Sequence, residues 1–224
     1  MSRLPFPVIA LFLATVGLAL WTFGKAVRGS RTAMLVLIAW VFLQSAIALS
    51  GFYLFTKTVP PHLILAVAPP LIFIAVLFVT AAGRRFLDGM ELKWCVLFHT
   101  IRIFVELNLY WLFLYKQVPA QMTFEAGNLD ILAGITAPVI WWAFSNGYVR
   151  RRGLLIWNCF AILGVLNAFS RALLSAPFRF QRFAFDQPTV AIFSFPFILL
   201  PAFLVPAVLL CHLVTFRKLP GRDA

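Results

Sequence analysis

The feature that most constrains the fold is a series of long apolar runs, of which residues 32–56 form the clearest. This stretch of 25 residues contains no charged side chain, and a helix of about 20 apolar residues crosses the roughly 30 Å hydrocarbon core of a bilayer. The composition agrees, because 62% of the 224 residues are hydrophobic and only 12% are charged. Soluble domains do not have this composition, so we expect an integral membrane protein embedded in a lipid bilayer.

Seven such runs divide the chain, and we predict an all-α bundle of seven transmembrane helices that forms a single domain over residues 1–224. The third run contains Pro69 and Pro70. Because proline lacks an amide donor, we expect a kink there. The predicted spans are residues 5–23, 32–56, 58–83, 94–115, 131–149, 153–170 and 188–216.

Lysine and arginine are distributed unequally between the two sides of this predicted bundle. Twelve of the nineteen lie in segments on one side: Lys25, Arg28, Arg31, Arg84, Arg85, Lys93, Arg150, Arg151, Arg152, Arg217, Lys218 and Arg222. Six lie on the other side, namely Arg3, Lys57, Lys116, Arg171, Arg179 and Arg182, and Arg102 lies within a span. The positive-inside tendency therefore places the N-terminus outside and the C-terminus in the cytoplasm. It also explains the net charge of +12 without a nucleic-acid partner, for which we find no motif.

The fourth span differs from the others because it carries His99, Arg102 and Glu106 in its interior. Steps of three and four residues place these side chains on one face of a helix. Ionisable groups within a membrane normally face the protein interior or a water-filled cavity, and the four-residue spacing permits an ion pair between Arg102 and Glu106. Two interpretations stay open: a structural strut that bonds to polar residues such as Asn167, or a site for protons or a small solute.

A second polar segment, residues 122–131, precedes the fifth span on the outer side. Asn128 can cap that helix, and Asp130 favours its positive N-terminus. Glu125 lies between aromatic and glycine residues, so we expect it to enter the mouth of the bundle and to interact with Arg171 or Arg179. Capping alone is the alternative explanation for this segment.

Residues 175–187 alternate arginine with phenylalanine on the same outer side. Rings at the headgroup level with guanidinium groups on phosphates are typical of an interfacial segment. The alternative is an outer vestibule in which Arg171, Arg179 or Arg182 attracts a small anionic solute.

Histidine and cysteine residues share a depth near the cytoplasmic side and raise the alternative of a metal or haem site. The candidate ligands are His99, His212, Cys159 and Cys211, with Cys95 at a similar level. Histidine and thiolate bind zinc or copper, and a histidine pair can hold a haem. Their spacing matches no metal motif, however, and buried cysteine usually packs as a small hydrophobic residue. The sequence therefore predicts neither a metal nor a defined cofactor.

Three motifs together resemble a family of bacterial multi-spanning membrane proteins. They are R-I-F-V-E at residues 102–106, M-T-F-E-A-G-N-L-D-I at residues 122–131 and F-P-F-I-L-L-P-A-F-L-V-P at residues 195–206. The resemblance covers most of the chain and implies a multi-pass protein of the bacterial inner membrane. It implies no particular activity or substrate.

The leading hypothesis is an inner-membrane protein with an outward-opening polar cavity that binds or moves a small solute or protons through Arg102 and Glu106. One alternative is a membrane-embedded enzyme that uses a metal or haem held by the histidine and cysteine residues. Another is a non-catalytic receptor or assembly subunit. The sequence leaves the substrate, the enzymatic status and the oligomeric state open.

Overall fold

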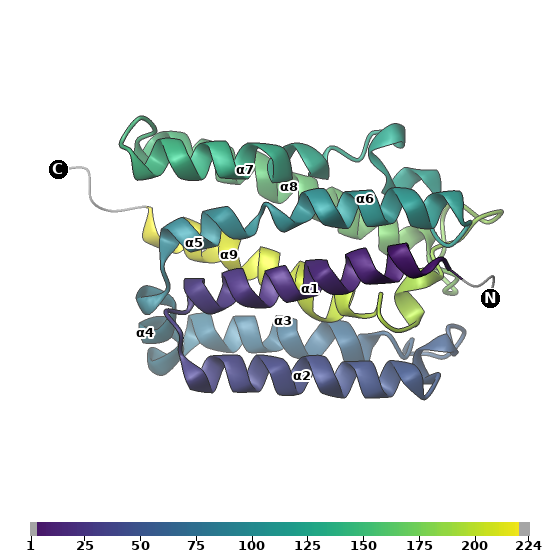
Figure 1. Ribbon diagram of the computed structural model, residues 1–224. Coiled ribbons are helices and arrows are strands. Elements are labelled where there is room, and N and C mark those ends of the chain that lie inside the picture. Colours follow the sequence, from purple (N-terminus) through teal and green to yellow (C-terminus); the bar gives the residue numbers. More distant parts are fainter. Residues whose placement is uncertain (1–3, 220–224) are drawn as a thin grey trace.

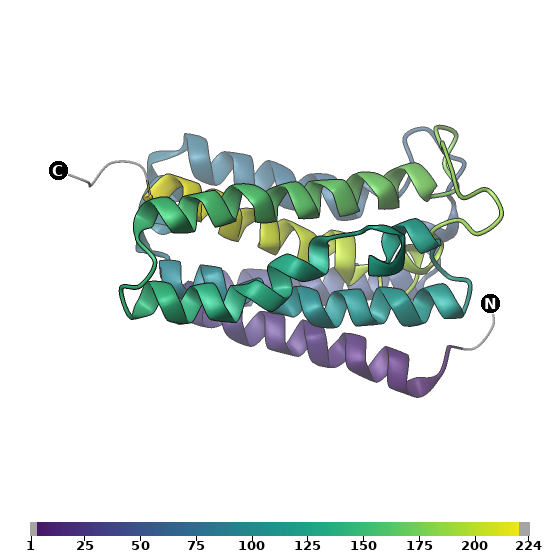
Figure 2. The same cartoon turned by 90° about the horizontal axis from the view of Figure 1, so that it is seen from above.

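The protein is an all-helical bundle in a computed structural model that describes residues 4–219, and this range contains no β-strand. The predicted all-α class is therefore confirmed. Its α-helices are α1 Phe6–Ala26, α2 Arg31–Leu49, α3 Ile64–Val79, α4 Ala81–Gly89, α5 Leu92–Phe98, α6 Ile101–Leu114, α7 Asp130–Ser145, α8 Arg151–Ser175 and α9 Val205–Lys218. Short 3-10 turns lie at Phe52–Leu54, Ala120–Met122, Phe124–Ala126 and Ala191–Phe193. Except for α4, the longer helices run along one common axis (Figures 1 and 2).

Several of these helices are long and apolar enough to cross a bilayer. Within residues 4–219 five segments meet that condition: α1, α2, the α5–α6 pair, α8 and Leu200–Lys218. The count becomes six if α3 and α4 are taken as one bent span, and α7 is a shorter apolar helix of 16 residues. The structure thus has the apolar helices of a membrane protein, by length and composition.

The third predicted span bends at Thr80 and not at its two prolines. Helix α3 continues through Pro69 and Pro70. Thr80 then adopts an extended backbone, and its hydroxyl accepts a hydrogen bond from the amide of Gly83 at 3.1 Å, which caps the next helix. Helix α4 consequently leaves α3 at 95°. The expected kink therefore lies ten residues later than the prolines indicated, because a threonine cap ends the helix there.

The fourth span is interrupted where its polar residues begin. Helix α5 ends at Phe98, α6 begins at Ile101, and His99 and Thr100 form a turn between them. The amides of His99, Thr100, Arg102 and Ile103 bond to carbonyls three residues back, as in a 3-10 helix. Such tightening within a helix often marks a functional hinge or strain.

The last predicted span is shorter than the expected 188–216. Residues 188–199 form an irregular segment with one 3-10 turn, and Ile192, Phe193 and Phe197 are buried within it. A π-helical turn, Leu200–Leu204, then leads into α9. Prolines at 196, 201 and 206 remove amide donors at regular intervals, so a regular α-helix starts only at Val205.

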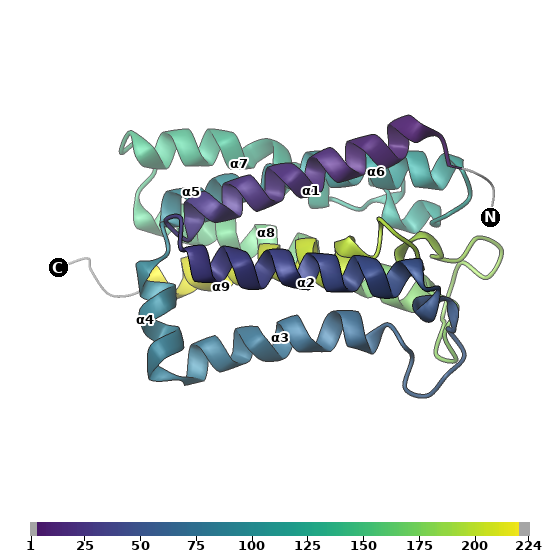
Figure 3. The ribbon, with the colours of Figure 1, turned by 60° about the horizontal axis from the view of Figure 1, so that its bottom comes forward.

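Helix α9 lies at the centre of the bundle, and α2 lies at its edge. Contacts join α9 to α3, α5 and α8, and most of its side chains are buried. Helix α2, by contrast, buries only Gln44 and Ala48. Figure 3 shows α2 and α3 together on one side of the bundle. Helix α2 therefore presents most of its apolar surface outward, which suits contact with lipid.

Basic side chains gather at one end of the bundle. The α1–α2 turn, α4, the start of α8 and the end of α9 all lie there (Figure 1). These segments hold Lys25, Arg28, Arg31, Arg84, Arg85, Arg150, Arg151, Arg152, Arg217 and Lys218, and Lys93 lies at the start of α5. Arg3 and Arg222 fall outside the described residues. The unequal distribution predicted along the chain is thus also a distribution in space.

At this basic end an exposed ion pair ties α4 to α9. Arg217 donates to both carboxylate oxygens of Asp88, at 2.7 and 2.9 Å, and its guanidinium lowers the pKa of Asp88 below the ordinary value. The folded protein therefore binds a proton at Asp88 less readily than the unfolded chain. The stabilisation is present above the unfolded-state pKa of about 3.9 and disappears as the pH falls through the lowered folded-state pKa.

We accordingly expect Asp88→Asn to lower the melting temperature slightly near neutral pH, and we expect this difference to shrink as the pH falls below about 4. The measurement is thermal unfolding of both proteins across that pH range. Asp186→Asn, a change at an exposed carboxylate for which the described structure shows no ion pair, is the control. A difference in melting temperature that does not depend on pH would contradict the assignment.

Candidate functional site

The candidate site is a buried polar network in the interior of the bundle. His99, Arg102 and Glu106, the polar stripe of the α5–α6 span, are 0%, 2% and 1% exposed. They meet polar residues from α7, α8 and α9, so the network joins four separate parts of the chain. Such groups are rare inside membrane proteins and usually mark a functional path or a structural pair.

Arg102 forms an ion pair with Asp130 at the start of α7. Its Nε donates to Oδ2 at 2.9 Å, and its Nη2 donates to Oδ1, which makes a two-pronged contact. Nη2 also donates to the carbonyl of Ala161 at 3.0 Å. The expected Arg102–Glu106 pair is therefore wrong: neither ion pair in the described residues joins these two side chains. A two-pronged contact with a carboxylate suits the planar guanidinium better than a contact along its own helix.

Glu106 bonds instead to Asn128 in the loop before α7. The side-chain amide of Asn128 donates to Glu106 Oε1 at 2.8 Å and to the carbonyl of Met122 at 3.0 Å. The other carboxylate oxygen, Oε2, is buried and has no hydrogen-bond partner in the described structure. An unpaired polar atom in an apolar surrounding is costly, so Oε2 is the atom of this network most in need of a partner.

Asn128 and Asp130 do more than cap a helix. Asn128 Oδ1 does accept from the amide of Asp130 at 3.3 Å, which is close to the capping role predicted from the sequence. Both side chains are buried, and their remaining groups bond to Glu106 and Arg102. The start of α7 and the loop before it thus supply one partner each to the two ionisable residues on α6.

Toward the basic end of the bundle the network continues through α9 and α8. Arg102 Nη1 donates to His212 Nε2 at 3.4 Å, and His212 Nδ1 donates to Asn158 Oδ1 at 2.7 Å. His212 is therefore a neutral ring with its proton on Nδ1. Asn158 also donates to the carbonyl of His212 at 3.2 Å. Sequence reasoning missed Asn158, although an asparagine in the apolar first half of this helix was an available signal.

His99 stacks on His212, with ring centroids 4.0 Å apart and 26° between the planes. Both nitrogens of His99 are buried and lack a hydrogen-bond partner in residues 4–219. The edge of its ring meets Trp157 at a centroid distance of 5.6 Å. His99 and His212 were predicted to lie at the same depth, and in the structure their rings are in direct contact.

This arrangement does not resemble a metal centre. Nitrogen ligands of zinc point at one atom from about 2.0–2.1 Å each, whereas the two stacked rings present their faces to each other. Cys211 contacts Cys95, and Cys159 is exposed. Among the described residues no group of three histidine, cysteine or acidic side chains could hold a metal ion. The geometry of these side chains therefore gives a metal or haem site no support.

An apolar cavity of about 320 Å³ reaches the network in the half of the bundle remote from the basic end. Helices α3, α6 and α8 and the π-helical turn form its walls, together with Phe178 and Phe180 from the segment predicted to be interfacial. Two charged residues line it, Glu106 and Asp130. The expected polar cavity is thus an apolar one with acidic groups at one place on its wall.

The arginines predicted to lie on the outer side, Arg171 and Arg179, take no part in the network. Arg171 donates to the carbonyls of Gln121 and Ala126, at 3.1 and 3.0 Å, and to Asn167 at 3.1 Å. Arg171 thereby holds the loop that contains Glu125 by bonding to backbone carbonyls of that loop and not to the Glu125 side chain. Arg179 donates to the carbonyl of Lys57 at 3.2 Å. Glu125 is exposed, and neither ion pair in the described part of the chain includes it, so its expected contact with an outer arginine is not present.

Two glycines allow the helices to approach the ion pair closely. A Cβ atom at Gly134 on α7 would lie 2.8 Å from the backbone nitrogen of Ile103 on α6. A Cβ atom at Gly164 on α8 would lie 3.1 Å from both Arg102 Nη2 and Asp130 Oδ1. Small residues at such positions let helix backbones pack closely within membranes.

Comparison with known proteins gives one match. The family model described as "Domain of unknown function (DUF8737)" matches residues 59–220. No curated protein and no solved structure matches the chain significantly. The matched region runs from the loop before α3 to the end of α9, so it includes the buried network and the cavity beside it and leaves out α1 and α2.

Proposed function

We propose that this chain, which belongs to the DUF8737 family, is a multi-pass membrane protein that binds protons or a small cationic solute at Glu106. The observation that carries the proposal is the unpaired Oε2 of Glu106 at the wall of an apolar cavity. An ionised carboxylate in such a place is costly. A proton on Oε2, or the ammonium group of a bound solute, removes that cost.

The proposed topology has seven spans, with the N-terminus outside and the C-terminus in the cytoplasm of a bacterial inner membrane. Seven spans require that α7 and the α3–α4 pair cross the membrane as well as the five longer segments. The segments that carry most of the basic residues lie at one end of the bundle (Figure 1), which supports the orientation. In this orientation the cavity beside Glu106 lies in the outer half of the membrane.

A cationic ligand or a proton suits this cavity better than the anionic solute considered from the sequence. Arg102 is not among the residues that line the cavity, and its N–H groups donate to Asp130, to the carbonyl of Ala161 and to His212. The charged groups on the cavity wall are both carboxylates. An anion entering the cavity would therefore meet negative charge, whereas an ammonium group would gain a charge-assisted hydrogen bond.

The cavity also indicates the form of such a solute. Apart from its two carboxylates, the lining consists of aliphatic and aromatic side chains, proline and methionine. Cavities of roughly 300 Å³ are at the lower end of those that hold small molecules. The solute that fits best has a small apolar body and one basic group.

The enzyme and the assembly-subunit hypotheses stay open but receive less support. A metal-dependent enzyme would need ligands that converge, and the stacked histidines do not. In a purely structural subunit the Arg102–Asp130 pair would stabilise the fold, but a buried Glu106 oxygen without a partner would have no purpose. Proton or solute binding explains the unpaired oxygen.

The test is Glu106→Gln, which keeps the shape of the side chain and its contact with Asn128 while removing the ionisable group. Infrared spectra of the wild type, recorded through a pH titration, should contain a protonated-carboxyl band that the variant lacks. Phenethylamine, a small apolar molecule with one basic group, should raise the melting temperature of the wild type and not that of the variant.

Glu125→Gln is the matched control because Glu125 is exposed and lies outside the network. It should keep both the carboxyl band and the response to phenethylamine. If the wild type and Glu106→Gln give the same infrared titration and the same response to the amine, the proposal is wrong.

A further inference from the structure

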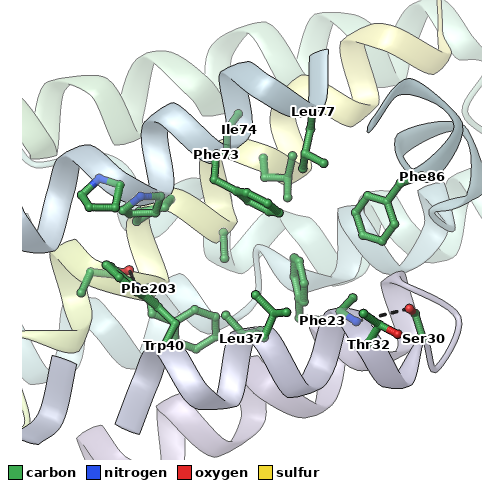
Figure 4. Close-up of a pocket in the computed structure, with 18 residues that line it drawn as sticks. Phe23, Ser30, Thr32, Leu37, Trp40, Phe73, Ile74, Leu77, Phe86 and Phe203 are labelled. Carbon is green, nitrogen blue, oxygen red and sulfur yellow. Dashed lines mark hydrogen bonds between the residues drawn. The ribbon is translucent and has the colours of Figure 1, made fainter. Parts of the chain in front are cut away.

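A second apolar cleft, of about 540 Å³, lies between α2 and α3, separate from the network described above. Leu37 and Trp40 on α2 point into it from one side, and Phe73 and Leu77 on α3 from the other (Figure 4). Phe203 in the π-helical turn and the start of α9 form its floor. Helices α2 and α3 therefore do not pack closely against each other as most neighbouring helices do, and an elongated space lies between them.

The cleft is open toward the outside of the bundle. Val36 and Phe73 both line it and are 55% and 53% exposed. In a membrane this surface faces the hydrocarbon core, because α2 is an apolar helix at the edge of the bundle. Hydrocarbon chains therefore have direct access to the cleft.

The interior of the cleft offers almost no polar contact. The indole nitrogen of Trp40 is satisfied by the carbonyl of Ala202 at 2.9 Å. The hydroxyl groups of the lining, on Ser30 and Thr32, lie together at the start of α2. An occupant must therefore be apolar along its length and can carry a polar group only at that one end.

That end carries unpaired positive charge. Arg31 lies between two lining residues, Ser30 and Thr32, and Arg85 directly precedes a third, Phe86. Both arginines are exposed, and in the part of the chain that the structure describes neither side chain has an ion pair or a hydrogen bond. Two exposed arginines without a described partner, each adjacent in sequence to lining residues at this end, favour an anion such as a phosphate.

The length of the cleft matches one membrane leaflet. Lining residues on α2 extend from Ser30 to Trp40, which is about 15 Å at a rise of roughly 1.5 Å per residue. Half of the roughly 30 Å hydrocarbon core is also about 15 Å. A chain that starts at the arginines would therefore end close to the middle of the membrane.

From these observations we propose that the cleft is a binding site for an anionic phospholipid of the leaflet at the basic end. One acyl chain lies between α2 and α3, and the phosphate lies by Arg31 and Arg85. The site is independent of Glu106, and α2, which forms one of its walls, lies outside the matched family region.

The test uses Ala207→Phe, because Ala207 is a small residue on the floor of the cleft and a ring there occupies the space of the acyl chain. Native mass spectrometry of protein purified in detergent and incubated with phosphatidylglycerol should show one bound lipid per wild-type chain. We expect the bound fraction to fall about tenfold in Ala207→Phe. Ile156→Phe, at a lipid-facing position on α8 that is 58% exposed, should keep the wild-type fraction.

The charge of the headgroup is tested separately. The double change of Arg31 and Arg85 to glutamine should weaken phosphatidylglycerol binding while leaving the binding of neutral diacylglycerol unchanged. Equal retention of phosphatidylglycerol by the wild type and Ala207→Phe would overturn the site, and an added mass of a second protein chain would show that the cleft is a dimer contact.

A crosslinking experiment on the wild type avoids any effect of the substitutions on folding. Phosphatidylglycerol with a photoreactive diazirine in its acyl chain is reconstituted with the unmodified protein and then irradiated. Peptides from α2, α3 and the start of α9 should carry most of the crosslinks. Crosslinks spread evenly over all lipid-facing helices would overturn the proposal.

Discussion

Arg102→Met and Asp130→Leu are each expected to lower the free energy of unfolding by about 3–5 kcal/mol, because each leaves the opposite charge buried without its partner. The two side chains are 2% and 6% exposed, and two hydrogen bonds join them. The double variant should recover most of the loss, since no uncompensated charge remains and both replacements are apolar. Thermal and denaturant unfolding of the two single variants and the double variant measure the coupling.

Two comparisons make this experiment specific. Arg102→Met combined with Glu106→Leu should not recover stability, because Glu106 bonds to Asn128 and not to Arg102. Loss of the exposed Arg217–Asp88 pair should cost far less, because solvent screens both charges. If Glu106→Leu, and not Asp130→Leu, recovered the stability lost in Arg102→Met, the result would support the Arg102–Glu106 pair expected from the sequence and contradict the pair in the structure.

Features that depend on local sequence were predictable. Long apolar runs gave the helical class because backbone groups in a membrane must bond within their own segment. The burial of His99, Arg102 and Glu106 followed from the cost of exposing charge to lipid. Both arguments need only the composition and spacing of one stretch of chain.

Pairing between segments was not predictable in the same way. Arg102 and Asp130 are 28 residues apart, and their contact depends on how α7 is rotated and how far it slides along α6. Periodicity gives the face of a helix, but it does not say which neighbour that face meets. The nearest opposite charge on the same helix, Glu106, was therefore the natural and incorrect choice.

The interruptions of the helices show a similar limit. Pro69 and Pro70 were expected to bend α3, but the bend occurs at Thr80, where a hydroxyl caps α4. The break at His99 and Thr100 contains no proline or glycine from which it could have been predicted. The bend at Thr80 has a local cause, the hydroxyl cap, which an argument based on the prolines alone overlooks, whereas no helix-breaking residue marks the second break.

Close packing at Gly134 explains how the pairing of α6 and α7 is achieved, and it leads to the second large effect that we expect. A Cβ atom there would lie 2.8 Å from the backbone nitrogen of Ile103. Backbone cannot turn aside as a flexible side chain can, so α7 would have to move away from α6. Gly134→Ala should therefore lower the free energy of unfolding by about 1–3 kcal/mol.

The matched control is Gly17→Ala in α1, where a Cβ atom would have no neighbour within 4 Å. The same chemical change should stabilise the protein there by about 0.5–1 kcal/mol, because alanine favours the helix more than glycine does. Opposite signs for the two substitutions, measured by thermal unfolding, would separate helix propensity from close packing. Stabilisation by both would mean that α6 and α7 are not in contact at Gly134.

The same substitution should also affect the candidate site. Asp130 begins the helix that Gly134 positions, so a displaced α7 moves its carboxylate away from Arg102 and moves Asn128 away from Glu106. We expect Gly134→Ala to weaken the response to phenethylamine as well as stability, whereas Gly17→Ala should leave that response unchanged. A destabilised Gly134→Ala protein with a full response would show that the packing of α7 supports the fold but does not position the carboxyl groups of the site.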